Sequence, residues 1–99
     1  MASLRACKVA EQIKKEISSI INHQVKDPRV GFVTITKVEV SNDLRHAKVY
    51  ISSLEDEAER AQSIKGLEQA KGFIRKEIAK RINLRYTPEL IIRFDDSIE

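Results

Sequence analysis

The sequence predicts an α+β fold in which a three-stranded mixed sheet carries three helices on one face. Three observations support this: three stretches have apolar residues at helical spacing, three others are β-branched or alternate apolar with polar residues, and turn residues lie between them. The predicted helices lie within residues 6–21, 53–70 and 73–83, and the predicted strands are 32–40, 46–52 and 90–94. The element order is therefore α-β-β-α-α-β, and we expect one domain over residues 1–99.

The first helix has one apolar side along its whole length. Its apolar positions are Ala6, Val9, Ala10, Ile13, Ile17, Ile20 and Ile21. Ser3 is the predicted N-cap, and Cys7 is expected to be a small buried hydrophobic residue. Fixing the backbone of so long a helix costs more free energy than burying these side chains provides. The apolar side must therefore pack against a sheet or other helices. The segment Asp27–Gly31, which contains Pro28, is expected to end the helix in a loop.

The first predicted strand changes the face to which its apolar residues point. Val33 and Ile35 share one face, whereas Val38 and Val40 would share the other. A β-bulge near Thr36-Lys37 would bring all four to the same side. Turn residues at 41–43 then predict an antiparallel pairing with the second strand, whose inward residues are Ala47, Val49 and Ile51. The third strand returns through helices, which predicts that it runs parallel to the second.

The segment between the second and third strands is expected to form two helices. Ser53 and Asp56 form a predicted capping box at the start of the first of them. Ala58, Ala61, Ile64 and Leu67 mark its expected buried face, and Phe73, Ile74, Ile78 and Ile82 that of the second. Gly72 at the junction has two interpretations. It is either a left-handed C-cap, or a tight kink that exposes backbone amides and a new helix N-terminus to phosphate.

Positive charge is concentrated near the end of the chain, although the net charge is only +3. The block from Lys71 to Arg85 holds one acidic residue, Glu77, among six cations: Lys71, Arg75, Lys76, Lys80, Arg81 and Arg85. Arg75, Lys76 and Lys80 are expected to point to solvent, and Arg5 and Lys8 add charge at the first helix. This pattern favours a surface for RNA phosphates, with a solubilising helix face or a site for an acidic protein as the alternatives.

The sequence shows no motif of an enzyme, a metal site or a membrane protein. His23 and His46 lack metal-ligand spacing, and no phosphate-binding Gly-rich loop or nucleophile motif is present. A carboxylate nuclease built from Asp43, Asp95 and Asp96 is the remaining catalytic alternative, although a turn and a solvated chain end explain these residues better. With a lone cysteine and no long apolar run, we expect a cytoplasmic protein without catalytic residues, metal, cofactor, small-molecule substrate or membrane contact.

Several segments together resemble the ribosome-binding factor A family. They are RACKVAEQIKKEI (5–17), DPRVGFVTITKVEVS (27–41), DLRHAKVYIS (43–52), AKGFIRKEIAKRINLRYTPEL (70–90) and FDDSIE (94–99). The resemblance implies a type II KH-like fold, in which an Ala-x-Gly kink at Ala70 and Gly72 replaces the Gly-x-x-Gly loop of KH domains. It also implies a non-enzymatic factor that binds the small ribosomal subunit near the decoding region of its 16S rRNA.

In that family the role implied is assistance in late maturation of the small subunit, including processing of the RNA 5′ end, with a link to growth in the cold. The expected partners are the small subunit and an assembly GTPase, and the expected state is a monomer. The residues expected to contact RNA are Arg5, Lys8, Lys71, Gly72, Arg75, Lys76, Lys80, Arg81 and Arg85. Because aromatic residues make up only 5% of the chain, base stacking is expected to contribute little.

Overall fold

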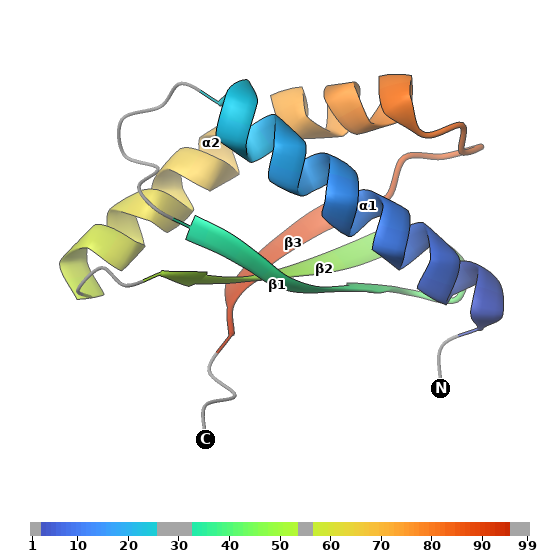
Figure 1. Cartoon of the computed structure of the whole chain (residues 1–99), viewed down its shortest axis with the longest axis horizontal. Helices are drawn as coiled ribbons and strands as arrows, with labels where there is room; N and C mark the ends of the chain where they lie inside the picture. The colour runs from blue at the N-terminus through green and yellow to red at the C-terminus, as the bar shows by residue number, and fades with distance from the viewer. Residues whose placement is uncertain (1–2, 26–32, 54–56, 96–99) are drawn as a thin grey trace.

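Two helices pack on one face of a three-stranded sheet in the computed structural model, which describes residues 3–25, 33–53 and 57–95 (Figure 1). The elements in chain order are α1 (Leu4–His23), β1 (Val33–Val40), β2 (His46–Ser53), α2 (Glu57–Arg81) and β3 (Glu89–Phe94). α1 packs mainly on β1, α2 packs on β3, and the two helices contact each other. The predicted loop Asp27–Gly31 and the capping residue Asp56 lie outside the described residues. The prediction that Ser53 begins a helix is wrong, because Ser53 is the last residue of β2 and pairs with Val33 of β1.

The predictions for α1 are confirmed except at one position. The Ser3 hydroxyl caps the helix by accepting a hydrogen bond from the Ala6 amide at 3.1 Å. All seven predicted apolar positions are buried. Cys7, however, is exposed, so its predicted burial is wrong. It lies on the flank of the helix with Glu11 and Lys14, beside the buried stripe rather than within it.

The sheet has the predicted mixed pairing and the predicted bulge. β1 is antiparallel to β2 with a register shift between Ile35 and Lys37, and β2 is parallel to β3. Thr36 is the extra residue, and its hydroxyl donates to Oδ2 of Asp95 at 2.8 Å. The residues buried under the helices are Ile35, Val40, Ala47, Val49, Ile51, Leu90 and Ile92. Lys37, Glu39, Lys48 and Arg93 are exposed on the opposite face, which no helix covers.

The prediction of three helices is wrong, because α2 is one continuous helix across Ala70–Gly72. No glycine in the described part of the chain has a positive φ, so Gly72 is not a left-handed C-cap. Nor does a new helix N-terminus form there to meet phosphate. The buried stripe continues through the junction, since Leu67 and Ile74 are buried and Ala70 and Lys71 are half-buried. The two halves of α2 still run in different directions, as a bend within an unbroken helix (Figure 1).

The buried side of α2 also differs from the predicted one. Ala58 and Ala61 are exposed, and Phe73 is 41% exposed. Ser63 lies four residues before Leu67, on the same side of the helix, and is fully buried. Phe73 precedes the buried Ile74 by one residue and therefore lies about 100° around the helix from it.

Three segments distant in sequence meet at one end of the sheet. β1 ends there, and β2 and β3 begin there because they are parallel. The Ser3 amide donates to Oδ1 of Asn42 at 2.8 Å, which ties the start of α1 to the β1–β2 turn. The Glu89 amide donates to the Arg45 carbonyl at 2.8 Å, which ties that turn to the loop after α2. This end lies on the right of Figure 1 and carries the candidate site.

Candidate nucleic-acid interface

The predicted cations divide into two groups, and the first group stabilises the fold. Lys71 Nζ lies 2.7 Å from Oε1 of Glu68 in an ion pair along α2. Arg75 donates from Nε to the Pro88 carbonyl at 3.1 Å and from Nη2 to the Thr87 carbonyl at 2.9 Å. Arg75 is exposed as predicted, but its guanidinium is held by these two carbonyls and fixes the loop before β3.

Arg81 joins the two helices. Its Nη2 donates to Oε1 of Gln24 at 2.6 Å, and its Nη1 lies 3.1 Å from Oε1 of Glu16. Glu77, the acidic residue within the basic block, is 3.9 Å from Nε of Arg81. Only 29% of the Arg81 side chain is exposed. This cation is therefore already paired and has little freedom to reach an external phosphate.

The second group is exposed. Lys76 and Lys80 lie one turn apart on α2, and Lys8 lies on α1. Lys80 pairs with Glu77 at 3.4 Å but keeps 66% of its side chain exposed. Gly72 is also exposed, between these lysines and the first half of α2. Arg5 and Arg85, the remaining predicted residues, belong to a pocket at the end of the sheet.

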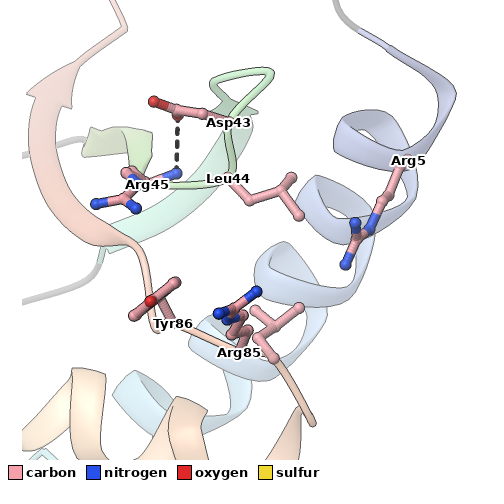
Figure 2. Close-up of a pocket in the computed structure, with 7 residues that line it drawn as sticks. Arg5, Asp43, Leu44, Arg45, Arg85 and Tyr86 are labelled. Atoms are coloured by element: carbon pink, nitrogen blue, oxygen red, sulfur yellow. Dashed lines mark hydrogen bonds between the residues drawn. The ribbon is translucent and has the colours of Figure 1, made fainter.

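That pocket, of about 170 Å³, brings together three arginines from three segments. Its lining residues are Arg5 from α1, Asp43, Leu44 and Arg45 from the β1–β2 turn, and Leu84, Arg85 and Tyr86 from the loop after α2. Figure 2 shows the side chains of Arg5 and Arg85 reaching toward the same space, with Tyr86 between Arg45 and Arg85. Positive charge is thus concentrated in a concave site, where field lines from several groups add.

Tyr86 positions two of the arginines. The guanidinium carbon of Arg45 is 5.0 Å from the centre of the Tyr86 ring, and that of Arg85 is 5.5 Å away. Both distances suit cation–π attraction, which leaves the N–H groups of each guanidinium available to an acceptor. Tyr86 itself is 54% exposed, so the arrangement is accessible from solvent.

The carboxylate in the pocket is bound to its own turn. Oδ1 of Asp43 accepts hydrogen bonds from the Ser41 hydroxyl at 2.6 Å and from the Arg45 amide at 3.0 Å. The Ser41 hydroxyl, followed by the Arg45 amide, holds the pKa of Asp43 below its ordinary value. Leu44 follows with φ of 62°, in the left-handed region that costs energy for a branched side chain. Its half-buried side chain packs against the core, and that packing offsets the cost.

The family model for "Ribosome-binding factor A" matches residues 5–99 of this chain. The chain belongs to the ribosome-binding factor A family. A ribosome-binding factor A from Halothermothrix orenii is 56% identical over 99 residues, which is 100% of this chain and 81% of the relative. The family is one of ribosome-binding factors and is not a known enzyme family.

Solved structures of ribosome-binding factor A share the fold. The solution structure of a candidate ribosome binding factor A from Thermotoga maritima matches with a TM-score of 0.84 and 37% identity, covering 100% of this chain and 94% of that one. A Thermus thermophilus ribosome binding factor A fitted into a map of a 30S complex matches with a TM-score of 0.73 and 24% identity. That match covers 90% of this chain and 94% of the other, and at this identity it supports the fold alone.

Two pocket residues of this family member, Arg45 and Tyr86, were not among the predicted contacts. Arg45 precedes a strand and Tyr86 lies in a loop, so neither belongs to the basic helical block on which the prediction depended. The order and directions of the predicted strands could have identified both residues. An antiparallel pair followed by a parallel strand places the turn at 41–45 and the loop at 82–88 at the same end of the sheet. Arginines in both segments could have been paired on that basis.

The carboxylates of the nuclease alternative do not meet. Asp43 lies where β2 and β3 begin, whereas Asp95 follows β3, so the six residues of that strand separate them by roughly 20 Å. Asp96 lies outside the described residues. Across the described ranges, no three His, Cys, Asp or Glu residues group closely enough to hold a metal ion. The same ranges contain no helix with the length and apolar character needed to cross a bilayer.

Proposed function

We propose that this protein is a cytoplasmic ribosome assembly factor that binds the small ribosomal subunit through its 16S rRNA. It assists late maturation of the subunit, including processing of the RNA 5′ end, and matters most for growth in the cold. The fold is a type II KH-like domain over residues 1–99, working as a monomer without catalytic residues or a cofactor.

The observation that carries this proposal is that Arg5, Arg45 and Arg85 all line one pocket of a ribosome-binding factor A domain. Guanidinium groups suit phosphate because their planar donors form paired, charge-assisted hydrogen bonds with its oxygens. Because the chain belongs to the ribosome-binding factor A family, we infer that the phosphates it binds are those of ribosomal RNA. A Thermus thermophilus ribosome binding factor A has itself been fitted into a map of a 30S complex.

In this mechanism the protein acts by occupying a site rather than by chemistry. Phosphate contacts set position and orientation, and the shape of the folded RNA determines where enough phosphates meet the cations at once. The exposed Lys8, Lys76 and Lys80 extend the positive surface beyond the pocket. A bound factor would hold an immature RNA conformation until an assembly GTPase displaces it.

Charge reversal on α2 tests the RNA surface. Lys76→Glu with Lys80→Glu should weaken binding to purified small subunits at least about tenfold, because each lysine lost removes a phosphate contact. Lys65→Glu, an exposed position on the first half of α2, is the matched control and should bind normally. Arg75 is left intact because it fixes the loop at 87–88. Unchanged subunit binding by the folded double variant, with binding to an acidic protein lost, would favour the protein-interaction alternative.

The maturation role is tested in cells of the source organism. Removing the gene should slow growth most strongly at low temperature and should increase the fraction of 16S rRNA that carries an unprocessed 5′ end. Expression of the wild-type protein should restore both, and the α2 double variant should restore neither. Normal 5′ ends in cells that lack the protein would refute this part of the proposal.

A further inference from the structure

The pocket at the end of the sheet has more positive charge than its own residues neutralise. Three guanidinium groups share it with one carboxylate, and Asp43 already accepts two hydrogen bonds within its turn. Within the described residues, none of the three arginines forms an ion pair. Guanidinium groups held together repel one another, so an anion bound among them would stabilise the arrangement.

The pocket also has an apolar part that a bare anion does not need. Leu44 and Leu84 line it beside the arginines, and both pack against the core while staying half-buried. Leu44 holds this place in a left-handed backbone conformation, which is unusual for a bulky side chain. A ligand with one charged end and one apolar surface would use both parts.

We propose that this pocket binds one unpaired nucleotide of an RNA strand. Its phosphate lies among Arg5, Arg45 and Arg85, and its sugar and base lie against Leu44 and Leu84. This inference rests on the proposed function, since it names the part of the RNA that the pocket recognises. A nucleotide paired in an A-form helix presents its phosphate but not its base, whereas a splayed nucleotide can enter a concave site with both.

Tyr86 acts as a positioning residue in this site. Arg45 and Arg85 both lie within cation–π distance of its ring, so contact with the ring limits the movement of both guanidinium groups at the edge of the pocket. The phenol hydroxyl has no part in this attraction. Tyr86→Phe should therefore preserve selectivity for an unpaired nucleotide, and Tyr86→Leu should reduce it.

The test compares two hairpin RNAs that differ only by a single unpaired nucleotide in the stem, with affinities measured by fluorescence anisotropy. The wild-type protein should bind the bulged hairpin about tenfold more tightly than the paired one, because only the bulge offers an accessible base. Arg45→Gln with Arg85→Gln should remove this preference. Lys76→Gln with Lys80→Gln, which loses the same charge outside the pocket, should weaken both hairpins equally and keep the preference.

Several results would contradict the nucleotide pocket or the proposed function. No preference in the wild type, or a pocket variant that retains the preference, would overturn the nucleotide pocket. Binding to purified small subunits is measured alongside: a wild type that fails there refutes the proposed function instead. Titration with inorganic phosphate, followed by the amide signals of Arg45 and Tyr86 in NMR spectra, separates RNA from free phosphate. An affinity for phosphate alone that equals the affinity for the bulged hairpin would overturn the assignment to RNA.

Discussion

Replacing Gly72 with alanine should stabilise the protein. Gly72 lies inside α2, its φ is not positive, and a Cβ built on it meets nothing within 4 Å. Alanine therefore adds no clash and no backbone strain. It restricts the unfolded chain and has the higher helix propensity, which together predict a gain of about 0.5–1 kcal/mol in the free energy of unfolding.

For a domain of this size that gain corresponds to a rise of about 2–8 °C in the melting temperature. Urea and thermal unfolding followed by circular dichroism measure it. Gly72→Val is the matched control: valine adds a side chain at the same site but has a weaker helix propensity, so its gain should be smaller than that of alanine. If Gly72 were instead a left-handed residue at a break between two helices, both variants would be less stable than the wild type. A loss of stability in Gly72→Ala would refute the continuous helix.

Two further predictions concern residues outside the pocket's guanidinium groups. Arg81→Met removes the donors that bond to Glu16 and Gln24 and should lower the free energy of unfolding by about 1 kcal/mol, measured by urea unfolding, since partly exposed pairs contribute modestly. Unchanged stability would show that this link between the helices is not stabilising. The Ser41 hydroxyl lowers the pKa of Asp43, so the folded state favours the ionised carboxylate. The stability gained from this carboxylate is present at pH values above 3.8, the ordinary pKa of the group, and is lost as the pH falls below 3.8. The difference in urea midpoint between wild type and Asp43→Ala should therefore shrink from pH 7 to pH 3, and a constant difference would contradict this linkage.

The fold could be predicted well from local patterns because most elements have one buried side. The apolar spacing of α1 and the shift of apolar face near Thr36 identified a helix and a bulge that the structure confirms. The prediction of a helix break at Gly72 is wrong because a glycine in a sequence suggests a break even where its backbone adopts ordinary helical angles. Here the stripe from Leu67 to Ile74 is continuous through two half-buried residues, one of which is a lysine. A hydrophobicity pattern cannot show that a lysine stem is partly covered.

The candidate site was harder to predict because charge along the sequence does not show which cations are already paired. Lys71 and Arg81 belong to the basic block but pair with acidic residues, and the partner of Arg81, Glu16, is distant in sequence. Arg45 lies far from the block and still joins Arg85 in one pocket. Both facts follow from tertiary packing. Tyr86 is exposed and lies against two arginines, so a chain with few aromatic residues still presents one at its candidate site.

The salt dependence of binding to purified small subunits tests the central claim most directly. Each phosphate contact removed should lower the slope of log affinity against log salt concentration by roughly 0.7 to 0.9. A protein with Arg5, Arg45 and Arg85 all changed to glutamine loses the one phosphate held in the pocket and should therefore show a slope smaller by roughly 0.7 to 0.9. The wild type and a Lys65→Gln control should share the steeper slope. Equal slopes for the triple variant and the wild type would contradict the claim that this pocket binds ribosomal RNA phosphate.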